Sequence, residues 1–136
     1  MLPSEVFISH SSLDAPFAAL ITELLQRHGV PFWLSRRNLV GAQQWHDEIG
    51  AALNRCDWFV VILSPDSVAS KWVKRELLFA LDDDRYDGKI IPLLYRPCEY
   101  KELSWALSLL QMVDFTVDFD AGSRDLLRVW GIGLRT

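Results

Sequence analysis

Segments of strand-type and helix-type residues alternate along the whole chain, and this alternation restricts the fold more than any other feature. Short runs rich in Val, Ile and Phe are each followed by a stretch with apolar residues at helical spacing. Strands separated by helices of this length form βαβ units, which build a parallel sheet with helices on both faces. The sequence therefore predicts an α/β fold.

The expected strands cover residues 5–9, 30–34, 58–63, 89–95 and 113–117, and the expected helices cover 14–28, 43–55, 64–81, 103–110 and 122–130. The run 58–63 is uninterrupted and apolar, which is typical of a central parallel strand covered on both faces. Pro31 cannot donate a ladder hydrogen bond, so it is expected at the start of the second strand or at an edge of the sheet. This order predicts a flavodoxin-like, five-stranded parallel sheet.

The chain has 136 residues, a length that suits one domain, taken as 1–136, with a real hydrophobic core. A net charge of -4 argues against a nucleic-acid surface. No apolar run is long enough to span a membrane, and the first residues lack the features of a signal peptide. Cys56 and Cys98 are expected to be buried thiols in a reducing compartment, so a cytoplasmic location is expected.

Several common chemistries are excluded by missing motifs. The chain contains no G-x-G-x-x-G, no G-x-x-x-x-G-K-[ST] and no G-x-S-x-G, which argues against a dehydrogenase, a nucleotide triphosphatase and a serine hydrolase. The histidines, His10, His28 and His46, do not have metal-ligand spacing. Because ligands of open parallel sheets bind beyond the carboxyl ends of the strands, a site is expected at 10–14, 35–42, 64–72 or after 95.

The segment 70–76 contains the pair Trp72 and Glu76, four residues apart and therefore on one face of a helix. This helix is expected to begin just beyond the carboxyl end of a strand, so that face lies near the predicted cleft. Taken alone, the pair is more simply interpreted as a core tryptophan and a surface carboxylate flanked by Lys and Arg.

Three motifs in order change that interpretation: Phe7-Ile8-Ser9-His10, Gly41-x-x-x-Trp45 and Ser70-x-Trp72-x-x-x-Glu76. Together they resemble the TIR (Toll/interleukin receptor) domain family, and its bacterial-type, NAD-cleaving members in particular. The resemblance covers nearly the whole chain, from residue 5 to residue 130. One position departs from it, because Ser35 stands where many members have an aspartate at the end of the second strand.

The resemblance implies an NAD glycohydrolase that releases nicotinamide and ADP-ribose, or a cyclic form of ADP-ribose, in defence (including antiviral defence) or cell-death signalling. Glu76 would be the catalytic residue, and NAD would be the substrate, with no cofactor or metal. Glycoside cleavage usually needs two carboxyl groups, one of them an acid for the leaving oxygen. Nicotinamide leaves as a neutral molecule from a cationic ring, so one carboxylate that stabilises the charge growing on the ribose can suffice.

The same motifs and loops supply candidate residues for binding the substrate. Trp72, and less strongly Phe7, could offer a ring face to the cationic nicotinamide, although Phe7 fits the core equally well. His10 and Ser11 could contact nicotinamide or ribose, or could cap the turn. Arg36, with its neighbour Arg37, could bind phosphate through forked hydrogen bonds, although an exposed arginine pair is more often solvated.

The resemblance also implies self-association with other TIR domains, through the loop 35–42, where Leu39 and Val40 lie beside basic residues. A sensor domain, or a separate partner chain, would then control the activity. The alternative hypothesis is a non-catalytic adaptor that signals through TIR–TIR contacts alone, with no need for Glu76.

Overall fold

The computed structural model describes residues 2–35 and 42–135, and for residues 42–45 it describes the backbone alone. Its sheet has five strands in the order β2-β1-β3-β4-β5, and every neighbouring pair is parallel. The strands are β1 Val6–Ser9, β2 Phe32–Leu34, β3 Trp58–Leu63, β4 Ile90–Leu94 and β5 Val113–Asp114. The predicted flavodoxin-like sheet is confirmed, and β2 lies at its edge, as Pro31 indicated.

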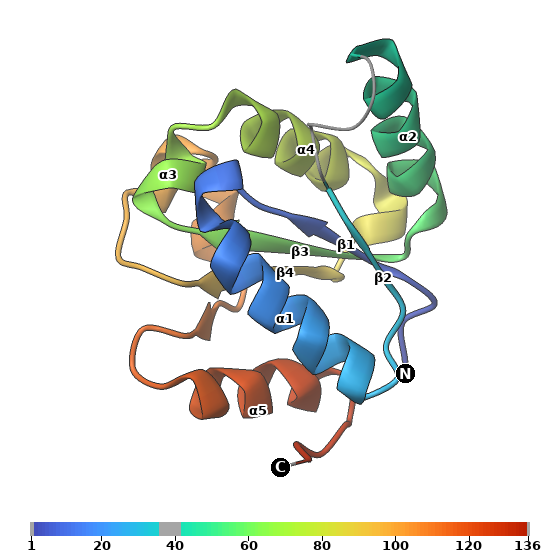
Figure 1. Cartoon of the computed structure of the whole chain (residues 1–136). Coiled ribbons are helices and arrows are strands. Elements are labelled where there is room, and N and C mark those ends of the chain that lie inside the picture. Colours follow the sequence, from blue (N-terminus) through green and yellow to red (C-terminus); the bar gives the residue numbers. More distant parts are fainter. Residues whose placement is uncertain (1, 36–41, 136) are drawn as a thin grey trace.

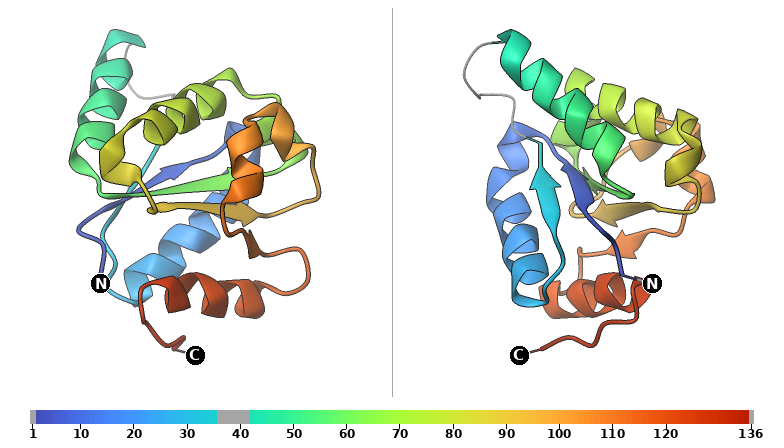
Figure 2. Two further views of the ribbon diagram at one scale, coloured as in Figure 1. Left: turned by 180° about the vertical axis from the view of Figure 1, so that it is seen from behind. Right: turned by 90° about the vertical axis from the view of Figure 1, so that its right-hand side faces the viewer.

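Helices cover both faces of this sheet (Figures 1 and 2). The α-helices are α1 Ala15–Arg27, α2 Ala42–Arg55, α3 Pro65–Val68, α4 Lys71–Asp82 and α5 Phe119–Val129. The short 3₁₀ segments are η1 Ser12–Asp14, η2 Asp84–Tyr86, η3 Tyr100–Glu102 and η4 Trp105–Leu109. One face is covered by α1 and α5, and the other by α2, α4 and η4.

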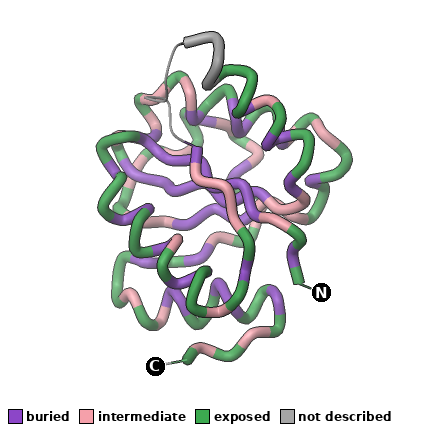
Figure 3. Tube along the Cα trace, turned by 45° about the vertical axis from the view of Figure 1, so that its right-hand side comes forward, coloured by how far each residue is buried: buried purple, intermediate pink, exposed green. Residues whose placement is uncertain are grey.

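The strands supply one apolar core to each face because successive side chains point to opposite sides of a sheet. Val6 and Ile8 of β1 pack with α1 and α5, whereas Phe7 packs with α2 and α4. Figure 3 shows the buried residues following the strands through the middle of the molecule. A strand that is buried on both faces reads as a continuous apolar run, as β3 does in the sequence.

The predicted helix 64–81 is in fact two helices. Ser64 caps α3 through a reciprocal pair of hydrogen bonds with Ser67, and Ser70 accepts a hydrogen bond from the Val73 amide at the start of α4. Serine side chains accept hydrogen bonds from backbone amides that a continuous helix would use itself, so the helix is interrupted between Ser64 and Ser70. The break places Trp72 in the first turn of α4 and Glu76 in its middle.

The carboxyl-terminal part differs most from the prediction. The expected helix 103–110 is the 3₁₀ segment η4, and the expected strand 113–117 pairs over two residues only. The last helix begins at Phe119 rather than near Gly122, because Asp118 accepts a hydrogen bond from the Asp120 amide and caps it. None of the described helices is both long enough and apolar enough to cross a membrane.

Candidate functional site

Glu76 lies on the inner side of α4, the helix that begins beyond the carboxyl end of β3. Its neighbours on that side of the helix are Val73, Leu77 and Ala80, which pack on the sheet. Only 2% of the Glu76 surface is exposed. The interpretation of this residue as a surface carboxylate is therefore wrong: α4 points an acidic side chain into the protein.

Two serine hydroxyls bind the Glu76 carboxylate from the sheet. Ser9 donates its Oγ proton to Oε1 over 2.6 Å, and Ser35 donates to Oε2 over 2.5 Å. Both serines are fully or almost fully buried. Each carboxylate oxygen thus has a hydroxyl donor, which offsets much of the cost of burying the charged group.

The sheet register explains why both serines reach one carboxylate. Strands β1 and β2 are parallel neighbours, and Ile8 pairs with Leu34. Ser9 ends β1, while Ser35 directly follows β2 and donates its backbone N–H to the Ile8 carbonyl over 3.0 Å. The two serines therefore stand side by side where ligands of parallel sheets usually bind.

Trp72 is half-buried and lies one helical turn before Glu76 on α4. The Arg75 guanidinium lies 4.9 Å from the centre of its ring, a cation–π arrangement. This contact shows that the Trp72 ring can lie against a planar cation.

The other predicted binding residues differ in their surroundings. The Phe7 ring is fully buried and stacks on Trp33 and Phe59, each at 5.3 Å between ring centres, so it has the core role and no exposed face for a substrate. Ser11 caps η1 by accepting a hydrogen bond from the Leu13 amide over 3.2 Å. His10 is buried beyond the end of β1. Arg36, Gly41 and the loop 36–41 lie outside the described residues, as does the Trp45 side chain.

A second polar cluster lies at the carboxyl ends of β3 and β4. Ser64 donates its hydroxyl to Oδ2 of the buried Asp14. The Arg96 guanidinium lies 3.7 Å from Oδ1 of Asp14 and donates to Asp66 over 2.8 Å. Burial raises the pKa of the Asp14 carboxyl and Asp66 raises it further, while the Ser64 hydrogen bond and Arg96 oppose that rise. This cluster joins η1, α3 and the segment after β4.

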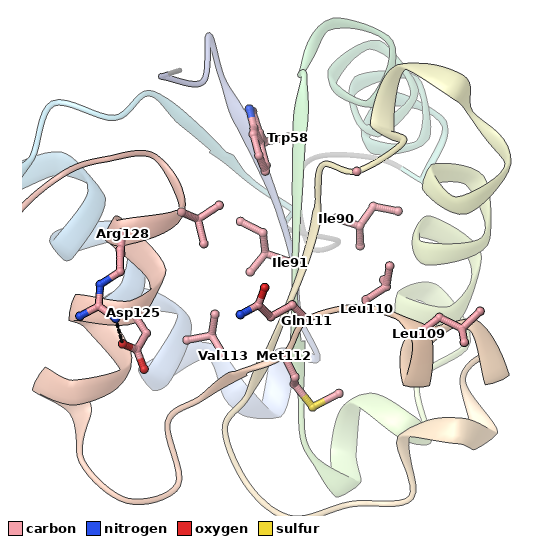
Figure 4. Close-up of a pocket in the computed structure, with 12 residues that line it drawn as sticks. Trp58, Ile90, Ile91, Leu109, Leu110, Gln111, Met112, Val113, Asp125 and Arg128 are labelled. Atoms are coloured by element: carbon pink, nitrogen blue, oxygen red, sulfur yellow. Dashed lines mark ion pairs between the residues drawn. The ribbon is translucent and has the colours of Figure 1, made fainter.

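Figure 4 shows a hollow at the opposite end of the strands. It is lined by the first residues of β3, β4 and β5 and by α5, and the Asp125–Arg128 ion pair, at 3.2 Å, lies at its side. Glu76 does not line it, so it is not the predicted site. Within the described ranges no group of three or more His, Cys, Asp or Glu side chains could hold a metal ion.

Both cysteines are free thiols. Cys56 is buried as expected, and its burial raises the pKa of the thiol to about 12. Cys98 is half-buried rather than buried, and burial also raises the pKa of its thiol. Neither is a reactive thiolate, since a lowered pKa marks such groups.

Ser9 was not among the candidate residues of the sequence analysis, and Ser35 entered it only as a departure from a pattern. The signal was present, because a serine follows the apolar run of each of the first two strands. What the sequence lacked was the register that places both serines against Glu76.

The protein is thus a small α/β domain, with a doubly wound parallel sheet and a buried glutamate at the carboxyl ends of β1 and β2. The TIR domain pattern matches residues 6–127 of this chain, which therefore belongs to the TIR domain family. Comparison with curated proteins gives no match.

Solved structures show the same fold. The TIR domain of the Toll-related receptor TRR-2 from Hydra magnipapillata is 25% identical, with a TM-score of 0.71 over 91% of this chain and 95% of that one. The TIR domains of the activated Roq1 resistosome, which recognises the pathogen effector XopQ, are 14% identical, with a TM-score of 0.72 over 93% and 98% of the two chains. A prokaryotic SEFIR domain is 18% identical, with a TM-score of 0.66 over 97% and 96%.

Proposed function

We propose that this TIR domain is an NAD glycohydrolase, which cleaves the bond between nicotinamide and ribose and uses Glu76 as its catalytic residue. The observation that carries the proposal is the buried Glu76 carboxylate, oriented by two hydroxyl groups and one helical turn after Trp72 on α4. The products would be nicotinamide and ADP-ribose, linear or cyclic, and the activity would serve defence or cell-death signalling.

The proposed chemistry needs a negative charge next to the ribose. Cleavage passes through an oxocarbenium-like state, in which positive charge grows on the sugar. An oriented carboxylate in a water-poor environment stabilises such charge far more than a solvated one does. Both Glu76 oxygens accept hydroxyl protons in the described structure, and the ribose hydroxyls of NAD offer donors of the same kind.

Trp72 is the residue that we propose for the nicotinamide side of the site. Its ring already carries the Arg75 guanidinium at 4.9 Å, and a nicotinamide ring is likewise a flat cation. His10 and Ser11, next to Ser9 in the chain, and Arg36 in the loop beyond Ser35 complete the proposed substrate contacts.

The decisive experiment replaces Glu76 with glutamine. Gln has nearly the same shape, and its amide can hydrogen-bond both serines because a hydroxyl both donates and accepts. It lacks the negative charge, so we expect NAD cleavage to fall on the order of 100- to 1000-fold with little change in the melting temperature. Cleavage is measured by nicotinamide release and by identification of the ADP-ribose product.

Glu23→Gln is the matched control, since Glu23 is an exposed carboxylate on α1, on the other face of the sheet. This variant should cleave NAD at the wild-type rate. A Glu76→Gln protein that melts like the wild type and also cleaves NAD like the wild type would refute the catalytic role.

The second candidate is a non-catalytic adaptor that acts through TIR–TIR association. The observation in its favour is the same burial, because a carboxylate that accepts one hydroxyl from β1 and another from the end of β2 also ties α4 to the sheet. Wild-type protein that consumes no NAD, even when concentrated, combined with a large loss of stability in Glu76→Ala, which removes both serine contacts, would favour this function.

A further inference from the structure

Ser35 stands where many TIR domains have an aspartate at the end of the second strand. In this structure it is buried and contacts Glu76. The Ser35 side chain is buried, with 1% of its surface exposed. Its hydroxyl lies 2.5 Å from Oε2 of Glu76, while its backbone N–H continues the ladder to β1.

We infer that Ser35 is a positioning residue, whose hydroxyl holds the Glu76 carboxylate in the orientation needed for cleavage. This inference rests on the proposed function. Ser35 would act through Glu76 and would not contact the reacting atoms. Its hydroxyl and that of Ser9 bind different oxygens, so together they fix the rotation of the carboxylate about its last side-chain bond.

The chemistry of the hydroxyl explains why a serine suits this place. A serine is neutral and donates a proton, whereas an ionised aspartate has acceptor oxygens only. An aspartate side chain facing Oε2 would put two negative charges in contact at a buried site, and one of them would have to take up a proton. With Ser35, Oε2 of Glu76 has a neutral hydrogen-bond donor at this place.

Substitution of Ser35 is expected to disturb the sheet less than substitution of Ser9. Ser9 belongs to β1, an interior strand that pairs with β2 on one side and β3 on the other. Ser35 follows an edge strand and takes part in the sheet through its backbone. Replacing its side chain therefore removes the hydroxyl and leaves the strand hydrogen bonds in place.

The kinetic experiment compares Ser35→Ala with Ser35→Thr, which restores a hydroxyl at the same carbon. A hydrogen bond to a charged group corresponds to about a 10- to 100-fold effect, so we expect kcat of Ser35→Ala to fall by that factor. KM should change by less than about threefold, because no substrate contact is removed. Ser35→Thr should recover most of kcat, a rescue that a purely structural defect would not show.

Ser123→Ala is the matched control. Ser123 is fully buried in α5, on the other face of the sheet, and its hydroxyl has no hydrogen-bond partner among the described residues. Its loss should leave kcat and KM unchanged. Wild-type kcat in Ser35→Ala, or equal losses in Ser35→Ala and Ser35→Thr at unchanged melting temperature, would overturn the positioning role while the proposed NAD cleavage stands.

A second measurement tests the contact without any turnover of NAD. Urea unfolding of wild type, Ser35→Ala, Glu76→Ala and the double variant forms a double-mutant cycle, because alanine removes the acceptor that the Ser35 hydroxyl binds. We expect the second substitution to destabilise the protein less when the first is already present. If the wild type does not cleave NAD, the proposed function fails, yet this non-additivity would still support Ser35 as the residue that holds Glu76. Additive effects would overturn the inference whatever the enzyme assay shows.

Discussion

The two buried carboxylates of the described residues, Glu76 and Asp14, are stabilised in different ways. Glu76 accepts a hydroxyl proton on each oxygen. Asp14 accepts one hydroxyl proton, from Ser64, and its other oxygen has the Arg96 guanidinium at 3.7 Å, beyond hydrogen-bond distance. Burial raises the pKa of the Asp14 carboxyl, and the single hydroxyl donor from Ser64 only partly opposes that rise.

The raised pKa of Asp14 predicts a pH-dependent stability. Its pKa lies above the ordinary value of 3.8, mainly because of burial. A folded protein with such a group binds the proton more tightly than the unfolded chain does. The resulting stabilisation is therefore present at low pH and is lost as the pH rises from about 4 through the raised pKa.

The variant Asp14→Asn isolates this effect, because the amide cannot ionise and its oxygen can still accept from Ser64. We expect the free energy of unfolding of the variant, minus that of the wild type, to increase as the pH rises from about 4. The increase should be about 1.4 kcal/mol for each unit of pKa shift. Urea unfolding at a series of pH values measures it, and a difference that is constant or falls with pH would contradict the prediction.

At the scale of elements, α5 is set against the end of the sheet by a very close contact. A Cβ atom built on Gly122 of α5 would lie 2.5 Å from Cδ1 of the Phe115 ring, a distance that real Cβ atoms do not occupy. Gly122 is buried, and Phe115 belongs to the same apolar core. The helix can therefore approach this ring only where it has no side chain.

This contact predicts opposite effects for one substitution at two helical glycines. Gly122→Ala should destabilise the protein by about 1–3 kcal/mol, because the added methyl group pushes α5 away from the Phe115 ring. Gly50→Ala, in α2, should stabilise it by about 0.5–1 kcal/mol, because alanine favours a helix and nothing lies within 4 Å of the new Cβ. Thermal unfolding of both variants tests the pair, and equal shifts of the melting temperature would contradict the prediction.

At the scale of the whole molecule, the sheet brings functional groups to one end and leaves the hollow of Figure 4 at the other. Strand order explains this arrangement, because β1 lies between β2 and β3, and α4, which follows β3 and α3 in the chain, contacts β1 and β3. The carboxyl ends of the first strands and one face of α4 thus meet around Glu76.

Self-association is the prediction that belongs to this scale. The resemblance to other TIR domains implies a contact through the loop 35–42, of which Ser35 is described and lies next to Glu76 in space. We therefore expect NAD cleavage per molecule to rise with protein concentration, in parallel with the appearance of oligomers in light scattering. Constant activity per molecule over a wide dilution series of a protein that stays monomeric would rule out this coupling.

The sequence by itself determined the architecture of this protein. The apolar run of β3 and the helical spacing of α1 were sufficient, because hydrophobic periodicity is a local property that each segment carries along its own length. It also singled out Glu76 and Trp72, whose spacing on a helix is local as well. Local patterns did not predict the length or type of elements that tertiary packing determines. Examples are the two-residue strand β5 and the 3₁₀ segment η4.

The tertiary structure decided the surroundings of Glu76. That a carboxylate flanked by basic residues is buried, and that hydroxyls from the ends of two strands bind it, depends on the parallel register of β1 with β2 and on the way α4 lies across them. These partners are 67 and 41 residues away in the sequence. No periodic pattern links residues at such separations, so the contacts that orient the carboxylate exist only once the sheet has formed.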